Sequence, residues 1–477
     1  MTRVLFLAAA LLIALPVAGN VRAQNAPFQP GPNEGLFLIV TDIHFDPFTV
    51  PSLVPKLDGS EVSRWPEIMK KAADGDVATY GADAGYILTR SAVEAAAAQD
   101  MTYDFVFYTG DHLSHRFNAH YNRYAGSNGN GVTSFSIKTT QYVSQLLSDS
   151  FGGIPVFGVL GNEDSACGDY QVAPDGAYLA GVGSLWATLS RQPERFGAFH
   201  NYGSYKVVHP TVADQDIIAL NNIFWSRSYS DNCNPEGGDP GNDVMSWLDQ
   251  QLSETRQAGR KAQILMHVPP GADAFDTART SGSRSCDGSI HLFWHDHFLN
   301  RFLAMMQTYA GTVEYTFSGH THMDGFTVIS DASGAPMIAN QVTPSVSPHF
   351  GNNPAFAVFL YDRTSGHILD SATFYASNLD EAAQEGSGAK PAWELEYVYR
   401  DTYGIPDLSP QSRADLASRF RNDDALRQRF TDLYTVSLEG RFEHQNPIRK
   451  YDDWQAFACA LNAVSWQSYE TCYCGRQ

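Results

Sequence analysis

Short apolar runs recur along the chain, and each is followed at once by polar residues. These runs span residues 36–40, 105–108, 156–160, 264–266 and 312–317. A short, continuous apolar run bounded by turn residues is typical of a buried strand. Between the runs lie stretches with the apolar spacing of helices, at residues 87–98, 138–147, 243–256 and 292–309. This alternation predicts an α/β fold whose functional side chains follow the ends of strands.

After residue 322 the pattern changes. Apolar runs at 326–329, 337–339, 355–361 and 368–375 are separated by turn residues, which predicts antiparallel strands. Residues 379–390 are small or polar and form the best linker candidate, and helical patterns follow at 409–433 and 452–464. We therefore expect a catalytic domain over 24–378 and a helical, cysteine-bearing extension over 379–477.

The first 23 residues have the pattern of a secretory signal peptide. Arg3 precedes an apolar run over residues 4–17, and small residues follow up to Ala23. The run is too short to span a membrane, and no later stretch approaches the roughly 20 apolar residues that a span needs. We expect cleavage near Ala23, no transmembrane segment, and a secreted or periplasmic mature chain.

Six cysteines fit an exported protein, because disulfides form in oxidising compartments. Their pairing is left open by the sequence. Cys472 and Cys474 are too close to pair with each other, and Cys459 is a candidate partner for one of them.

The charge balance limits the partners. The chain has 32 Lys and Arg against 52 Asp and Glu, a formal net charge of −20. Removing residues 1–23, with two basic and no acidic residues, changes −20 to −22. Such a field repels nucleic acid polymers and anionic lipid surfaces. A small anionic substrate remains compatible if metal ions hold it.

Potential metal ligands follow the predicted strands, early and late in the chain. They are Asp42, His44, Asp111, Asn162, His267, His320 and His322. Carboxylates that can bridge, neutral imidazoles and an amide oxygen are the mixture that two neighbouring divalent cations need. Each short motif alone is weak evidence, whereas the ordered set in one chain is strong.

The same motifs carry a family resemblance. They are Asp42-Ile43-His44, Gly110-Asp111 with His115 beyond it, Gly161-Asn162, His267-Val268-Pro269, and Gly319-His320-Thr321-His322. The set resembles the calcineurin-like metallophosphoesterase superfamily and, within it, the acid sphingomyelinase and acid sphingomyelinase-like phosphodiesterase family. The resemblance runs from about residue 36 to about residue 375, with a helical tail of the kind that family carries.

The resemblance implies a four-layer αββα sandwich with two divalent metal ions. Asp42, His44, Asp111 and His322 would hold one ion, and Asp111, Asn162, His267 and His320 the other, with Asp111 bridging. A hydroxide held between the ions would attack phosphorus opposite the leaving group. The family implies zinc, although manganese or iron also suits these donors.

Position 163 departs from the family pattern, which has a histidine after Gly-Asn where this chain has Glu163. A glutamate can replace that histidine as a proton donor only in its protonated form. His115 matches a second family histidine near the leaving group. Our hypothesis is that His115 is the principal acid and that Glu163 is an auxiliary or specificity residue.

Four functions fit these residues. Only residues 24–35 separate the predicted cleavage site from the first strand, so we expect no saposin-type lipid-presenting domain. A small soluble phosphodiester or pyrophosphate, such as a nucleotide or a CDP-choline-like molecule, is therefore the expected substrate. The alternatives are a sphingomyelin phosphodiesterase, a phosphomonoesterase on the same site, and a non-catalytic metal-bearing protein that lost turnover with the histidine at 163.

Overall fold

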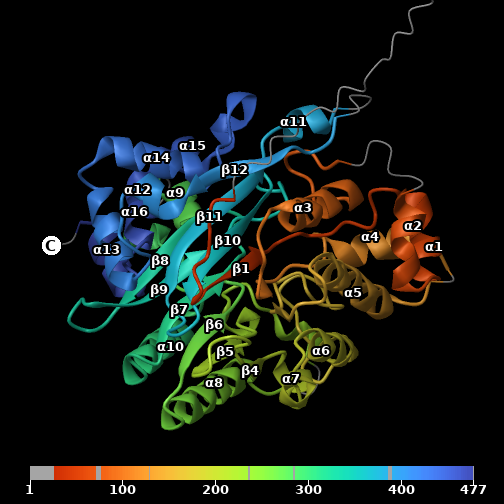
Figure 1. The fold of residues 1–477 in the computed structure, drawn as a ribbon, viewed down its shortest axis with the longest axis horizontal. Helices are drawn as coiled ribbons and strands as arrows, with labels where there is room; N and C mark the ends of the chain where they lie inside the picture. Colours follow the sequence, from red (N-terminus) through yellow and green to blue (C-terminus); the bar gives the residue numbers. More distant parts are fainter. Residues whose placement is uncertain are drawn as a thin grey trace, which may run out of the picture.

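Two six-stranded sheets form the centre of the molecule (Figure 1). The computed structural model describes residues 26–70, 77–127, 129–234, 237–282, 285–384 and 389–475. The predicted signal peptide, residues 1–23, lies outside these residues. The strand orders are β12-β11-β10-β1-β2-β3 and β4-β5-β6-β7-β9-β8.

The first sheet contains three of the predicted buried strands. β1 (Glu34–Val40), β2 (Phe105–Tyr108) and β3 (Val156–Gly158) run parallel. The other three strands are antiparallel to their neighbours: β10 (Ala355–Asp362), β11 (Ile368–Ala376) and β12 (Trp393–Val398). β12 follows the predicted linker and pairs with β11, so this sheet draws residues from both sides of position 378.

The second sheet has a parallel centre and antiparallel edges. Its strands are β4 (Tyr205–Val208), β5 (Gln215–Ala219), β6 (Lys261–Leu265), β7 (Val313–Ser318), β8 (Gly325–Ser330) and β9 (Pro336–Val342). The run at 337–339 is antiparallel to β8, as predicted, but it is also parallel to β7, because β9 lies between them.

Helices pack on both sheets, which gives the predicted αββα sandwich. α3 (Tyr86–Ala98), α5 (Val132–Ser150) and α6 (Ala177–Leu189) contact the first sheet. α8 (Pro240–Gln257) and α13 (Pro410–Arg419) contact the second, and α10 (Asp296–Thr308) packs beside α8. The helix predicted from residue 292 begins at Asp296, because Leu292 and Trp294 form β-bridges.

Aromatic side chains fill the space between the sheets. The ring of Phe317 on β7 lies 5.7 Å from Phe37 on β1, 5.6 Å from Phe107 on β2 and 5.7 Å from Phe359 on β10, measured between centroids. All four side chains are buried. Truncating a buried phenylalanine to alanine costs roughly 3–5 kcal/mol, so this cluster contributes substantially to holding the two sheets together.

The C-terminal segment is helical, and it packs beside the second sheet (Figure 1). The predicted helix 409–433 is divided into α13 and α14 (Asp424–Tyr434), and α15 (Pro447–Tyr451), α16 (Trp454–Ala460) and α17 (Trp466–Tyr473) follow.

All six cysteines are paired, as Cys167–Cys233, Cys286–Cys474 and Cys459–Cys472. The predicted disulfides are thus present, and Cys459 pairs with Cys472. Cys286–Cys474 joins the end of the chain to the segment before α10.

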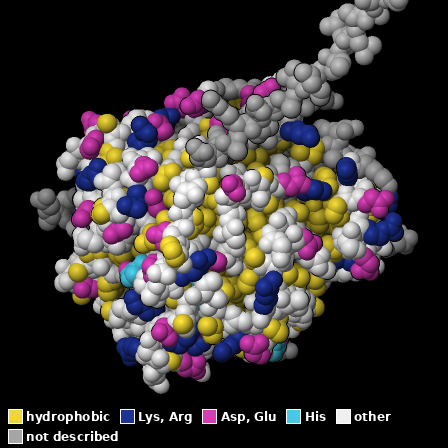
Figure 2. Space-filling view, in the orientation of Figure 1, with side chains coloured by type: hydrophobic (Ala, Val, Ile, Leu, Met, Phe, Trp, Pro, Cys, Tyr) yellow, Lys and Arg dark blue, Asp and Glu magenta, His cyan; other side chains and the backbone are white. Residues whose placement is uncertain are grey.

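Within the described ranges, no helix has both the length and the apolar character of a membrane span. The face in Figure 2 intersperses acidic and basic side chains with apolar ones, so neither sign of charge dominates it.

Candidate metal centre

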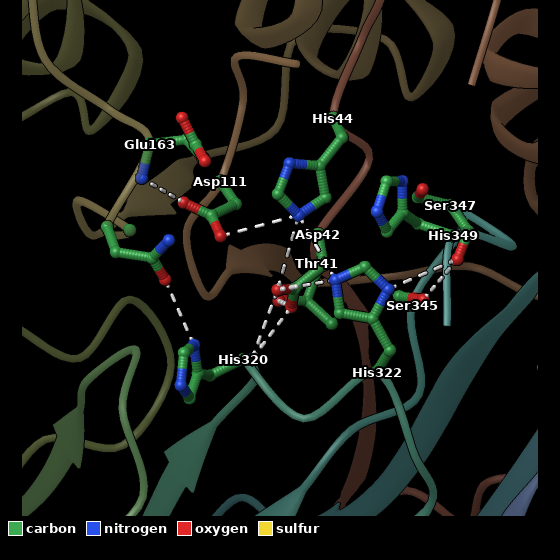
Figure 3. Close-up of polar contacts among 12 residues, drawn as sticks. Thr41, Asp42, His44, Asp111, Glu163, His320, His322, Ser345, Ser347 and His349 are labelled. Atoms are coloured by element: carbon green, nitrogen blue, oxygen red, sulfur yellow. Dashed lines mark hydrogen bonds and ion pairs between the residues drawn. The ribbon is translucent and has the colours of Figure 1, made fainter. Parts of the chain in front are cut away.

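The seven predicted ligand side chains meet at the carboxyl ends of strands from both sheets. Figure 3 shows five of them: Asp42, His44, Asp111, His320 and His322. Asp42 and His44 follow β1, Asp111 follows β2, and Asn162 follows β3. From the second sheet, His267 follows β6, while His320 and His322 follow β7. Parallel strands end at the same edge of a sheet, and the two sheets bring their edges together here.

Most of these side chains are carried by an unusual backbone. Five of the seven residues have positive φ angles: Asp42 (47°), His44 (45°), Asp111 (58°), His320 (72°) and His322 (65°). Such conformations cost of order 1–3 kcal/mol each and persist where surrounding contacts enforce them. Here the backbone N–H of Asp42 donates to the carbonyl of Gly110, and that of His44 donates to the carbonyl of Asp111, both at 3.0 Å.

Glycine precedes three of the ligand candidates, and at Gly161 and Gly319 a side chain would collide with a ligand carboxylate. A Cβ atom on Gly161 would lie 2.1 Å from Oδ1 of Asp111, and one on Gly319 would lie 2.3 Å from Oδ2 of Asp42. Real Cβ atoms do not approach neighbours this closely. The Gly-Asn and Gly-His motifs therefore reflect backbone passing directly against ligand carboxylates.

His44 and His322 form one half of the site with Asp42. Nδ1 of His44 donates to the carbonyl of Leu113 at 2.9 Å, and Nδ1 of His322 donates to that of Ser347 at 3.3 Å. Each Nε2 is thus left with its lone pair, and the two Nε2 atoms face each other across 3.1 Å. Oδ1 of Asp42 lies 3.6 Å from Nε2 of His322 and 3.9 Å from that of His44.

Asn162, His267 and His320 form the other half. Nδ1 of His267 donates to the carbonyl of Thr109 at 2.7 Å, and the Asn162 amide nitrogen donates to Asp169 at 2.9 Å. Oδ1 of Asn162 consequently faces Nε2 of His267 and Nδ1 of His320, each at 3.0 Å.

Asp111 lies between the halves. Its Oδ2 is 3.4 Å from Nε2 of His44 and 3.2 Å from Nε2 of His267.

These donors fit divalent metal ions. Two nitrogens on one tetrahedral zinc ion, each about 2.0–2.1 Å from it, stand roughly 3.3 Å apart, close to the spacings found here. Lone pairs that face one another also need a cation to offset their repulsion. Burial lowers the pKa of His44, His320 and His322 well below the usual value, so these imidazoles are neutral, as metal ligands must be.

The buried carboxylates need a positive charge as well. Burial raises the pKa of Asp42 to about 7, with the neighbouring Asp111 adding to the rise and His267 opposing it. Burial raises the pKa of Asp111 well above its usual range, and Asp164 contributes. A divalent cation reverses this effect and keeps both carboxylates ionised.

His115 stands beside the metal centre, held by a residue that sequence reasoning did not assign. Nδ1 and the backbone N–H of His115 both donate to Asp83, at 2.8 Å each. A second unpredicted residue, His349, places Nδ1 3.2 Å from Oδ1 of Asp83. Asp83 and His349 lie in loops far apart in the chain and outside the recognised motifs, so no sequence signal linked them to His115.

Glu163 lies on the other side of the centre. It is 5% exposed, and its backbone N–H donates to Oδ1 of Asp111 at 2.8 Å. Burial raises the pKa of its carboxyl to about 10, with Asp169 and then Asp111 adding to the rise. Burial and the neighbouring carboxylates favour the protonated form that a proton donor requires, whereas a cation held by the adjacent Asn162 and Asp111 opposes it.

Two further contacts, also missed from the sequence, orient the ligands. The hydroxyl of Tyr170 lies 3.1 Å from Nε2 of His320. The Asp164 carboxylate accepts from the backbone N–H of Gly161 at 3.0 Å and of His112 at 2.7 Å, which joins the loops that carry Asn162 and Asp111.

A cavity of about 720 Å³ opens in front of this centre. His115, Glu163 and His349 line it together with five of the seven ligand residues. Much of the remaining wall is apolar or aromatic, and the C-terminal segment supplies part of it, including Phe430, Tyr434 and Lys450. The volume lies in the range of small-molecule sites.

Two family models match the chain. Residues 35–324 match the calcineurin-like phosphoesterase family, and residues 333–476 match the acid sphingomyelin phosphodiesterase C-terminal region. The first match covers more than half of the chain and contains all seven ligand candidates.

Similar curated proteins extend over nearly the whole chain. Acid sphingomyelinase-like phosphodiesterase 3b of Homo sapiens is 25% identical, with 97% of this chain and 93% of that protein covered. Cyclic GMP-AMP phosphodiesterase SMPDL3A of Homo sapiens is 27% identical, with 96% and 93% covered. Sphingomyelin phosphodiesterase B of Dictyostelium discoideum is 25% identical, with 94% and 66% covered.

Proposed function

Since the chain belongs to the calcineurin-like phosphoesterase family and is a metal-dependent phosphodiesterase, we propose that it cleaves a phosphodiester or pyrophosphate bond of a small soluble molecule. The observation that carries the proposal is the cavity, which has the ligand cluster at its wall and a volume of about 720 Å³. Such a space encloses a nucleotide-sized molecule rather than a bilayer surface.

The ligands divide into two sets in this proposal. Asp42, His44, Asp111 and His322 would hold one divalent ion, and Asp111, Asn162, His267 and His320 would hold the other, zinc being our first choice of metal. When bound, such ions stabilise charge on the phosphate oxygens and lower the pKa of water at the site. The short distances from Asp111 to histidines of both halves support its assignment as the bridging ligand.

His115 is the proton donor in this proposal. Asp83 accepts a hydrogen bond from Nδ1 of His115, so Nε2 is the ring atom available to a substrate in the cavity. As water adds to phosphorus and loses a proton to solvent, the bond from phosphorus to the leaving oxygen breaks and its electron pair stays on that oxygen. His115 acts in this step with a proton on both ring nitrogens: the Nε2 proton passes to the leaving oxygen, and the neutral ring keeps its Nδ1 hydrogen bond to Asp83. A diester gives a phosphate monoester and an alcohol, and a pyrophosphate gives two phosphate products.

Glu163 is the auxiliary residue. Its position next to Asn162 and its place in the cavity wall support a role in contacting the substrate. A carboxyl group in this position donates a hydrogen bond to a phosphate oxygen only while it is protonated.

The substrate class follows from the cavity and the relatives. An aromatic wall suits a planar base, and Lys450 offers a positive charge to a second anionic group. One similar protein is named as a cyclic GMP-AMP phosphodiesterase, which agrees with a nucleotide. We therefore place nucleotides first and CDP-choline-like molecules second.

Sphingomyelin hydrolysis is the second candidate function, and a different observation favours it. Phe275 and Phe350 are 41% and 49% exposed, and both line the cavity. Exposed aromatic residues at a site entrance suit contact with lipid.

Export is part of the proposal. Three disulfides suit an oxidising compartment, and the N-terminal sequence pattern supports secretion or a periplasmic location.

Hydrolysis assays test the proposed function. Purified, metal-loaded protein is given bis-p-nitrophenyl phosphate, p-nitrophenyl phosphate, a cyclic dinucleotide, CDP-choline and sphingomyelin in mixed micelles. We expect hydrolysis of the aryl diester and of a nucleotide, and little hydrolysis of the monoester. Preferential cleavage of sphingomyelin would favour the second candidate, and preferential cleavage of the monoester would contradict the diesterase assignment.

A further inference from the structure

Three imidazole rings form a column that runs from the metal centre along the cavity wall. The rings of His44 and His115 are 4.2 Å apart between centroids and within 18° of parallel. The rings of His115 and His349 are 4.0 Å apart and within 19° of parallel. His115 is thus held between a ligand candidate on one face and His349 on the other, and Figure 3 shows His349 on the side of His44 away from Glu163.

Asp83 contacts two of the three rings, the central His115 and the outer His349. Its Oδ1 accepts the hydrogen bond from Nδ1 of His115 at 2.8 Å. The same oxygen lies 3.2 Å from Nδ1 of His349, which is not directed at it as in a hydrogen bond, so this contact is an ion pair when His349 is protonated. Although burial opposes the effect, the two imidazoles hold the pKa of Asp83 below its usual range.

The loop that carries His349 also supports a ligand candidate. The carbonyl of Ser347 accepts from Nδ1 of His322, and the Ser347 hydroxyl lies 3.4 Å from Oδ1 of Asp83. Residues 347–349 therefore contact both the metal centre and the Asp83–His115 pair. The contacts to His322 and to the Asp83 oxygen are made by Ser347, so a change confined to the His349 side chain leaves the support of His322 in place.

We propose that His349 is a positioning residue for the reaction: it packs on the outer face of His115 and, with Asp83, fixes that ring so that Nε2 meets the leaving group of the substrate. This inference rests on the proposed function, in which His115 gives the proton.

The physical reason lies in the freedom of the ring. A hydrogen bond at Nδ1 leaves an imidazole able to tilt about that bond, and a ring packed on each face removes this motion. A proton donor must lie within about 2.6–3.2 Å of its acceptor, so a tilt of the ring changes the rate more than it changes binding.

Rates on leaving groups of different basicity distinguish a positioning role from a general loss of structure, because a general loss lowers the rate on all of them equally. We would measure kcat/KM for His349→Ala, His349→Phe, His115→Ala and the double variant His115→Ala/His349→Ala. The substrates are methyl aryl phosphates whose phenols differ in pKa, because a good leaving group needs little protonation and a poor one needs much. His297→Ala is the matched control, since His297 is exposed and lies outside the cavity wall.

We expect His349→Ala to lose roughly 10- to 100-fold on the most basic phenol and no more than about threefold on p-nitrophenol. His349→Phe, which keeps a packed ring and loses the Asp83 contact, should fall between the wild type and His349→Ala. The double variant should be no slower than His115→Ala, because both changes act on one proton transfer. An equal loss on all leaving groups, or additive losses, would overturn the proposal.

A second readout does not depend on turnover. In protein labelled with ¹⁵N-histidine, the His115 Nδ1–H that is bonded to Asp83 should give a protected, strongly deshielded proton signal. We expect His349→Ala to increase its exchange with water, while metal content and melting temperature stay as in the wild type. An unchanged signal would contradict positioning by His349 even if the enzyme proved to use other substrates.

Discussion

His44 and His322 direct their Nε2 atoms at each other across 3.1 Å, while the Nδ1 atom of each donates to a backbone carbonyl. Two neutral imidazoles in this arrangement repel, because both facing atoms carry lone pairs. The folded chain holds them there through strained backbone at both residues. The free energy that offsets this strain is expected to come from bound metal.

Metal removal should therefore lower stability as well as activity. We expect a chelator to abolish diesterase activity and to lower the melting temperature by several degrees, since a ligand that binds only the folded state stabilises it. Adding zinc or manganese back should restore both. His322→Ala should lose about one bound ion per chain in metal analysis, whereas the exposed His297→Ala should lose none. Full metal content in His322→Ala would contradict the ligand assignment.

His115 and Glu163 should differ in their effect on the rate. His115→Ala removes the proposed acid, and we expect kcat on a poor leaving group to fall by roughly 10²- to 10⁴-fold. Glu163→Gln keeps the size and the hydrogen-bond donor of a protonated carboxyl, so kcat should change by less than about tenfold. Steady-state kinetics on one diester check both variants. A large loss in Glu163→Gln with wild-type turnover in His115→Ala would reverse the two roles.

The sequence could predict that the candidate ligands lie close together because each of them follows a buried strand. Asp42, Asp111 and His267 come directly after apolar runs that form β1, β2 and β6. Strand ends meet at a shared edge, so position along the chain implied position in space.

Asp83 and His349 had no such signal. Asp83 lies before α3 and His349 lies between β9 and β10, in loops whose course depends on tertiary packing. The contact between the two side chains joins residues 266 positions apart in the chain. Contacts of this kind follow from the assembled fold rather than from local periodicity.

The sequence did not predict three strands, β4, β5 and β12. β12 follows a polar stretch and is only partly buried, so its pattern resembles that of a surface segment. β5 is buried, but it begins with the polar Gln215 and Asp216, which shorten its apolar run. Strands such as β1 were recognised because burial on both faces makes them continuously apolar.

The Cys167–Cys233 disulfide should support the loop that carries Asn162. It joins positions 66 apart, and the same loop contains Asp169 and Tyr170, which contact Asn162 and His320. We expect Cys167→Ser/Cys233→Ser to lower both kcat and metal affinity. Cys459→Ser/Cys472→Ser, which opens a bond between positions only 13 apart in α16 and α17, is the matched control and should leave turnover nearly unchanged.

The two disulfide double variants should also differ in stability, because the two disulfides close loops of different length. In the chain-entropy model the longer loop contributes about 1.4 kcal/mol more than the shorter one. Denaturant unfolding of the two double variants should show this order, and a greater loss of stability in the control pair would contradict it.

His209 should make the protein sensitive to acid. The side chain is buried, its Nδ1 accepts from the backbone N–H groups of Thr211 and Val212, and among the described residues its Nε2 has no partner. Burial lowers its pKa to about 3, whereas the unfolded chain has a histidine pKa of about 6.5. Between these values the unfolded state binds a proton that the folded state does not. The contribution of His209 to stability is therefore present above about pH 6.5 and is lost as the pH falls toward 3, by up to about 1.4 kcal/mol per pH unit.

His209→Asn cannot titrate, so its free energy of unfolding in denaturant should fall less steeply than that of the wild type from pH 6.5 to 4. If the free energies of unfolding of the wild type and of His209→Asn fell equally with pH, His209 would be protonated in the folded state without cost, and the prediction would be wrong.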